Sequence, residues 1–97
     1  MKDELIKLAL QKDFLFIVDS YYLWMCELQK WLRDKHNIHI NINTELDDGN
    51  IEYGVDIYTI DRKNFNCEYV GIDYTFDKVL EKGLFEALKL IKWTANK

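Results

Sequence analysis

The stretch FDKVLEKGLFEALKLIKW, residues 76–93, follows three segments of alternating polarity and has the spacing of an amphipathic helix. Asp77 is its expected N-cap, and Phe76 stands where a hydrophobic staple would be. Gly83 interrupts the helix, which predicts a close approach to the sheet or to the first helix. The apolar stripe consists of Leu80, Leu84, Ala87, Leu88 and Ile91. Because such a stripe has to be buried, the helix predicts a sheet for it to cover.

A second apolar stripe runs through the N-terminal part at helical spacing. It consists of Ile6, Leu10, Phe14, Ile17, Tyr21, Trp24, Leu28 and Trp31. One helix from Asp3 to Lys35 would be roughly 50 Å long, which is more than a small sheet can cover. We therefore expect a break near Lys12–Asp13, with Asp13 capping the main helix. The alternative is a long helix whose N-terminal part packs on a second subunit in a homodimer.

The middle of the chain alternates with a period of two residues, which predicts three strands. The strands are expected around Ile38–Asn43, at Ile51–Asp61 and at Asn66–Thr75. Turn residues at 47–50 and 62–64 separate them, and such short connections favour an antiparallel meander. In the third strand, the side chains expected to point inward are Val70, Ile72 and Tyr74.

The order of helix, three strands and helix predicts a two-layer α+β domain, αβββα, with both helices on one sheet face. The 97 residues correspond to a single domain, with residues 1–12 as a helical extension and residues 13–97 as the core. The other sheet face is expected to carry His39, Asn41, Glu52, Asp56, Tyr58, Tyr69 and Asp73.

The composition of the chain limits the classes of protein to which it can belong. A hydrophobic content of 48% excludes a disordered chain, and a net charge of −4 disfavours non-specific phosphate binding. Residues 1–12 lack the apolar core of a signal peptide, and residues 14–26 are too few to span a bilayer. Cys26 and Cys67 match no metal spacing. We expect a cytoplasmic protein with reduced cysteines and no membrane contact.

Residues with catalytic or ligand-binding potential are few. His36 and His39 form an HxxH pair, but it straddles the junction between helix and strand, so we interpret both as solvated. Asp56 and Asp73 could do acid–base work from one sheet face, but no nucleophile or histidine accompanies them at a recognisable spacing. We therefore predict no catalytic residue, no cofactor and no metal.

Exposed aromatic side chains favour a protein interface. Tyr58 and Tyr69 resemble a nucleic-acid stacking platform, yet the carboxylates around them have the wrong sign for phosphate. Phe85 and Trp93 fall off the main stripe of the last helix. The candidate partner-binding surface comprises Tyr58, Tyr69, Asp56, Asp73, Phe85 and Trp93.

The segments WLRDKHNIHINI, residues 31–42, and FDKVLEKGLFEALKLIK, residues 76–92, resemble a group of small uncharacterised proteins of phages and mobile elements in Bacteroidetes-type bacteria. Those proteins end in a helix similar to ALExGLxEALKLI. Residues 80–91 match this pattern, and Val79 stands where Ala is usual. The resemblance implies an origin and brings no catalytic residue.

The predicted element order is also similar to that of the double-stranded RNA-binding domain. That family grips phosphate with a Lys pair at the start of its last helix, where this chain has the acidic segment 73–78. The first hypothesis is therefore a non-enzymatic protein-binding module, such as an inhibitor of a host factor. The alternatives are a nucleic-acid binder using Arg62, Lys63, Lys78 and Lys82, and an enzyme or small-ligand protein using Asp56, Asp73 and His39.

Overall fold

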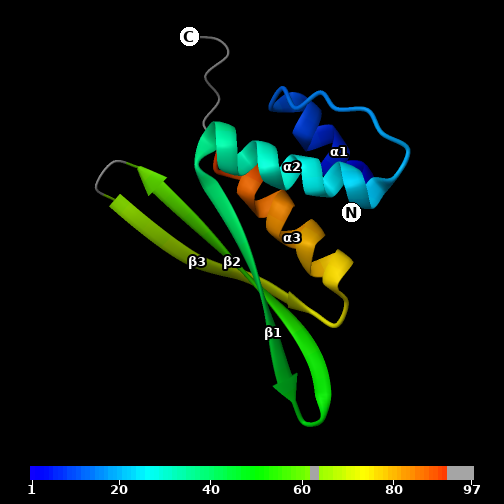
Figure 1. Ribbon diagram of the computed structural model, residues 1–97, viewed down its shortest axis with the longest axis vertical. Coiled ribbons are helices and arrows are strands. Elements are labelled where there is room, and N and C mark those ends of the chain that lie inside the picture. Colours follow the sequence, from blue (N-terminus) through cyan, green and yellow to red (C-terminus); the bar gives the residue numbers. More distant parts are fainter. Residues whose placement is uncertain (62–63, 92–97) are drawn as a thin grey trace.

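The computed structural model describes residues 1–61 and 64–91. The elements are α1 (Lys2–Gln11), α2 (Tyr21–His36), β1 (Ile38–Asp47), β2 (Asn50–Asp61), β3 (Asn64–Asp73) and α3 (Phe76–Lys89). The strands form one antiparallel sheet in the order β1-β2-β3, and the helices pack on it (Figure 1). The predicted α+β class and antiparallel meander are confirmed.

The hairpin of β1 and β2 is longer than the helices can cover. Asp48 and Gly49 form its turn with φ values of 51° and 84°, and two successive positive φ values are typical of the type I′ turns that suit hairpins. Figure 1 shows the tip of this hairpin projecting beyond the helices. Leu46 and Ile51 face each other near the tip and are 76% and 53% exposed.

The core lies between α3 and the sheet. α2 packs against α3 and β1, whereas α1 packs against α3. α1 adds Leu5 and Ala9 to this core, so residues 1–12 are more than an extension of it. The largest fully buried side chains are Leu5, Met25, Leu28, Leu32, Val55, Ile57, Val79, Leu80, Leu84 and Leu88.

The N-terminal apolar stripe is divided between two helices and an extended segment. Asp13 has a left-handed φ of 72° and ends α1. The Phe14 N–H donates to the Ala9 carbonyl (3.0 Å) and the Asp13 N–H to the Leu10 carbonyl (3.1 Å), which is the bond pair of a Schellman C-cap. The break near Lys12–Asp13 is confirmed, and the single long helix is wrong.

Both predicted helix caps are wrong: Asp13 lies seven residues before the N-cap of α2, and Asp77 lies two residues after the N-cap of α3. The Ser20 hydroxyl accepts the N–H of the third residue after it and caps α2, and Thr75 does the same for α3, each at 3.3 Å. Asp13 cannot cap α2 because it closes α1. Asp77 lies in the first turn of α3, where a negative charge is favourable beside the helix N-terminus.

A β-bulge in β3 reverses the side-chain alternation beyond it. The pairing with β2 shifts between Val55 and Asp56, which leaves Val70 without a partner across the ladder. Val70 packs on the core as expected, but Ile72 and Tyr74 are 40% and 67% exposed. The prediction that Ile72 and Tyr74 point inward is therefore wrong.

α3 approaches the sheet most closely at Gly83. A Cβ at this position would lie 2.7 Å from Cγ2 of Val55 and 3.2 Å from Cγ2 of Ile40. A glycine within a helix costs about 1 kcal/mol relative to alanine, so the contact with the sheet has to outweigh that cost. The predicted close approach is confirmed, and it is made to the sheet.

Gly83→Ala is expected to lower the free energy of unfolding by about 1–3 kcal/mol, because the added methyl group overpacks the contact with Val55. Urea denaturation measures this change. In a Val55→Ala background the loss should be smaller, since the nearest remaining Val55 atom, Cβ, is 3.8 Å away. Equal losses in the two backgrounds would show that this contact does not restrict position 83.

Asp13→Gly is expected to raise the free energy of unfolding by about 0.5–1 kcal/mol, because glycine adopts a positive φ without steric cost. Asp13→Ala, the matched variant, should lower it, since alanine also lacks a carboxylate but resists the left-handed conformation. Thermal denaturation of the two variants distinguishes the backbone effect from the charge effect. Equal shifts in both variants would contradict the C-cap assignment.

Candidate functional site

The sheet face turned away from the helices is the candidate site, and we call it the outer face. Cross-strand pairing sets His39, Tyr58 and Cys67 in one row, and partners directly opposite each other share a face. Among the described residues no helix covers this face (Figure 1). The outer face comprises His39, Asn41, Asn43, Glu45, Glu52, Gly54, Asp56, Tyr58, Ile60, Cys67, Tyr69 and Ile72.

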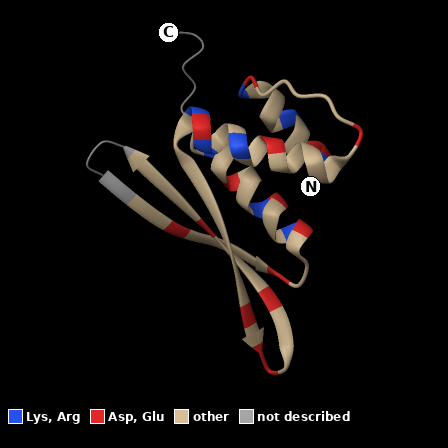
Figure 2. Cartoon of the chain, viewed as in Figure 1, with Lys and Arg blue, Asp and Glu red and all other residues tan. Residues whose placement is uncertain are grey.

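The sheet is the acidic part of the molecule. Figure 2 shows Asp and Glu on the strands and no Lys or Arg on their described parts, whereas the helices carry both signs. The carboxylates that the strand register places on the outer face are Glu45, Glu52 and Asp56. The outer face therefore presents negative charge, and a positively charged surface would complement it.

A chain of side-chain hydrogen bonds holds Asp56 in place on the outer face. The Asn43 Nδ2 donates to Oδ2 of Asp56 at 2.7 Å, and the Asn41 Nδ2 donates to Oδ1 of Asn43 at 3.0 Å. The carboxylate keeps its other oxygen for further donors. These bonds orient a charged acceptor toward whatever approaches the sheet.

Tyr69 lies across Gly54, where the missing side chain makes room for its ring. A Cβ at Gly54 would be 3.1 Å from Cε1 of Tyr69 and 2.9 Å from Oε2 of Glu45. Tyr69 is 55% exposed. Partial burial raises the pKa of Tyr69, and the charges of Glu45, Asp56 and Glu52 raise it further. Its hydroxyl therefore stays protonated and can donate a hydrogen bond at neutral pH.

Two neighbouring pairs complete the electrostatics of the outer face. Tyr58 lies opposite Cys67, and interaction with that thiol raises the pKa of Tyr58. Glu45 and Glu52 lie directly opposite each other, and like charges in this position are destabilising. Partial burial raises the pKa of Glu52, followed by repulsion from Asp47. A cation at this pair would relieve the repulsion.

Two residues of the candidate partner-binding surface, Asp73 and Phe85, lie elsewhere. Asp73 follows the bulge and faces α3, with Lys82 Nζ 3.5 Å from its Oδ2, so its placement on the outer face is wrong. Phe85 is half-buried on α3, packed against the core beneath Lys89. Trp93 lies outside the described residues. The structure thus brings together Asp56, Tyr58 and Tyr69.

The environment of Asp73 is structural. Partial burial alone would raise the pKa of Asp73, but hydrogen bonds from the Thr75 and Tyr74 N–H groups and the charge of Lys82 lower it. The carboxylate joins the end of β3 to the start of α3. Asp56 and Asp73 face opposite sides of the sheet, so they do not form the acid–base pair considered from the sequence.

The histidines of the HxxH pair lie in different environments. The His36 ring meets Trp31 edge-on with centroids 4.6 Å apart, and its Nε2 is buried with no hydrogen-bond partner among the described residues. His39 lies on the outer face, 3.4 Å from Oδ1 of Asn37. The interpretation of both as solvated is wrong for His36. The described residues contain no cluster of three or more groups able to hold a metal.

Acidification should destabilise the protein through His36. Burial lowers the pKa of His36 from its usual 6.5, and the charge of Lys35 lowers it further. Below pH 6.5 the unfolded chain therefore binds a proton that the folded chain resists, so stability falls as the pH drops from 6.5 toward the lowered pKa.

Thermal denaturation from pH 7.5 to 5 measures this effect. His36→Phe, which keeps a ring beside Trp31, should flatten the decline of the melting temperature over that range. An unchanged pH profile in this variant would assign the decline to other groups.

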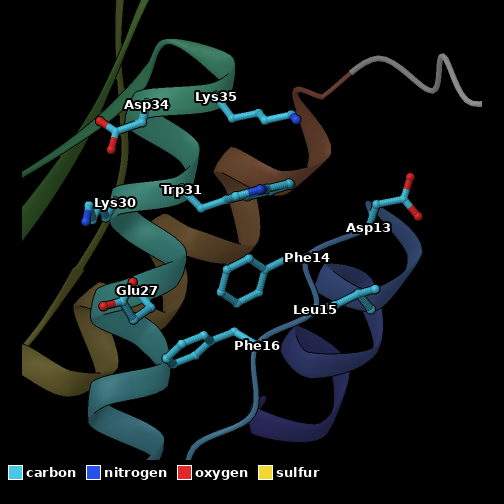
Figure 3. Close-up of a pocket in the computed structure, with 9 residues that line it drawn as sticks. All are labelled: Asp13, Phe14, Leu15, Phe16, Glu27, Lys30, Trp31, Asp34 and Lys35. Atoms are coloured by element: carbon cyan, nitrogen blue, oxygen red, sulfur yellow. The ribbon is translucent and has the colours of Figure 1, made fainter.

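A groove between α2 and the extended segment after α1 is a cavity that the sequence did not indicate. It holds about 510 Å³, and Figure 3 shows aromatic rings at its centre with charged groups of both signs around them. Its lining residues are Asp13, Phe14, Leu15, Phe16, Glu27, Lys30, Trp31, Asp34 and Lys35. In the sequence, only the apolar run at residues 14–17 points to this groove. Phe14 and Ile17 also fit the helical spacing of the N-terminal stripe, so the sequence alone predicts that the run is part of a helix.

Comparisons with protein-family models, with curated proteins and with solved structures find no match to this chain. Within the described part of the chain, no helix combines the length and the apolar character needed to cross a bilayer.

Proposed function

We propose that this chain is a small, non-enzymatic protein-binding module that uses the outer face to bind a positively charged surface of a partner protein. The observation that carries the proposal is an uncovered sheet face on which Tyr58 and Tyr69 stand among carboxylates, with no Lys or Arg in the described strands. Tyrosines supply contact area and hydrogen bonds, and carboxylates select Arg and Lys.

The repulsive pair at Glu45 and Glu52 supports the same reading. A cross-strand pair of like charges lowers the stability of the free protein. Natural proteins tolerate such unfavourable interactions mainly at functional sites. An Arg or Lys of a partner that reached this pair would remove the repulsion upon binding. The complex would form faster and more tightly at low ionic strength.

The cellular setting follows from the sequence resemblance. A phage or mobile-element origin and a cytoplasmic location fit a protein that acts on a host factor, and inhibition is one form such action would take. Self-association through the N-terminal helix stays a prediction. Leu5 and Ala9 of that helix are fully buried in the core of the same chain. A second copy that packed on this helix would therefore contact its other residues.

The nucleic-acid alternative has weaker support. Lys82 is engaged with the Ile72 carbonyl at 2.8 Å and with Asp73, so its ammonium group is not directed at a phosphate. Arg62 and Lys63 lie outside the described residues. The acidic outer face would repel a nucleic-acid backbone.

Affinity capture from a nuclease-treated bacterial lysate tests the proposed function. The wild-type chain should retain a stoichiometric protein that elutes at raised salt, and Tyr69→Ala together with Asp56→Arg should abolish that retention. Leu15→Ala, a variant on the opposite side of the molecule, is the control and should retain the same protein. A partner kept by the sheet variant and lost by the control would refute binding through the outer face.

Gly54→Ala offers a milder test of the same surface. The new Cβ would displace the exposed ends of Tyr69 and Glu45, so the free energy of unfolding should change by less than about 1 kcal/mol. Binding of the captured partner should weaken by roughly tenfold or more, a loss of about 1.4 kcal/mol. Titration calorimetry with that partner measures the effect, and unchanged affinity would show that Tyr69 is not in the interface.

A further inference from the structure

The two edges of the sheet differ in how they are protected. Natural proteins block edge strands with bulges, lysines or prolines. On β3, the bulge at Val70 interrupts the edge and Lys82 donates to the Ile72 carbonyl at 2.8 Å. On β1, the sequence from Ile38 to Asp47 contains no Lys and no Pro, and its pairing with β2 is regular throughout.

The hydrogen-bond pattern shows which groups of β1 face the free edge. The Ile60 N–H donates to the Asn37 carbonyl at 3.4 Å, one step before the first residue of β1. Residues of an antiparallel strand bond alternately to either side. Odd-numbered residues of β1 therefore bond to β2, and even-numbered residues direct their N–H and C=O groups to the edge.

One end of this edge is already occupied. The Gln29 side chain, on α2, donates from Nε2 to the Ile40 carbonyl at 3.2 Å. Ile42 still packs on the core with its side chain, and beyond it the strand belongs to the projecting hairpin, which the helices do not cover (Figure 1). Among the described residues, none bonds to the edge-facing backbone groups of Ile42, Thr44 and Leu46, which form the unblocked part of the edge.

We propose that a second copy of this chain pairs with the edge of β1 in antiparallel orientation, with Thr44 opposite Thr44 of the second copy. The two sheets then form one six-stranded sheet around a two-fold axis, and their outer faces join. The inference does not rest on the proposed function, because the edge can pair whether or not the outer face binds a partner.

Other symmetric registers conflict with the structure. A register centred on Ile42 or on Asn43 draws Ile40 into the new ladder, where Gln29 already binds its carbonyl. A register centred on Glu45 sets two carboxylates directly opposite each other. The register centred on Thr44 avoids both conflicts and uses the three free residues of the edge.

This register also matches the side chains. Ile42 meets Leu46 of the second copy, which covers a side chain that is 76% exposed in the single chain. Asn43 meets Glu45 of the second copy, and the Asn43 amide can donate a second hydrogen beside its bond to Asp56. Apolar groups therefore meet apolar groups, and each carboxylate meets an amide.

Sedimentation equilibrium of the full chain tests the proposal, with Thr44→Pro as the disrupting variant. The Thr44 N–H faces the edge, so proline removes no bond to β2. It removes both hydrogen bonds donated at the Thr44 pair, and the dimer should weaken by roughly tenfold or more. Thr44→Val, which keeps the N–H, should leave the dimer unchanged. Far-ultraviolet circular dichroism confirms that both variants fold.

Three results would overturn the proposal. These are a chain that stays monomeric up to millimolar concentration, a dimer that Thr44→Pro does not weaken, and a dimer lost instead in Leu15→Asp with Ile17→Asp. The last result would assign self-association to the exposed segment after α1.

A cysteine scan tests the register in a background of Cys26→Ser and Cys67→Ser. Thr44→Cys should form a disulfide-linked dimer under mild oxidation, since the Cα atoms of a hydrogen-bonded pair lie about 5.5 Å apart. Asp47→Cys, three residues from the two-fold axis, should not. Cross-linking at residue 47 and not at residue 44 would contradict the register.

Discussion

The contact between α3 and the sheet at Gly83 is the constraint on which the rest of the structure depends. With no side chain there, the helix backbone comes down onto Val55 and Ile40. A second bare position, Gly71, lies under the stem of Lys82 and allows its ammonium group to reach the end of β3. α3 is thereby held at the centre of the molecule. α1 and α2 then pack on α3, and the other sheet face stays uncovered.

The helices, the strands and the contact at Gly83 could be predicted because each depends on local periodicity or on one unusual residue. The helix ends could not be predicted in the same way. Asp13, Ser20, Thr75 and Asp77 all belong to residue types that favour caps, and only the tertiary structure selects Ser20 and Thr75. Asp13 instead adopts the left-handed conformation after the end of α1, a position that is usually occupied by glycine. The residues around Asp13 in the sequence do not indicate that it adopts this conformation.

The candidate site shows the same division. Alternation along β2 correctly predicts that Asp56 and Tyr58 share a face. The alternation of β3 also holds for Tyr69, because this residue comes before the bulge, and its placement on the same face is correct. Asp73 follows the bulge and was assigned to the wrong face, because one extra residue reverses every later position. The packing of Tyr69 over Gly54 and the opposition of two glutamates depend on register, which a single sequence does not specify. The residue types of the outer face are ordinary for a protein surface. The face is distinguished by the way in which strand pairing places these residues beside one another.

We propose that the outer face of the sheet is where this protein meets its partner. Site-specific photocrosslinking tests it most directly, with a benzophenone amino acid at position 69 in one sample and at position 15, on the far side of the molecule, in another. After the captured partner is added and the samples are irradiated, the account predicts a covalent adduct from position 69 and none from position 15. An adduct from position 15 alone would place the interface at the aromatic groove and contradict the account.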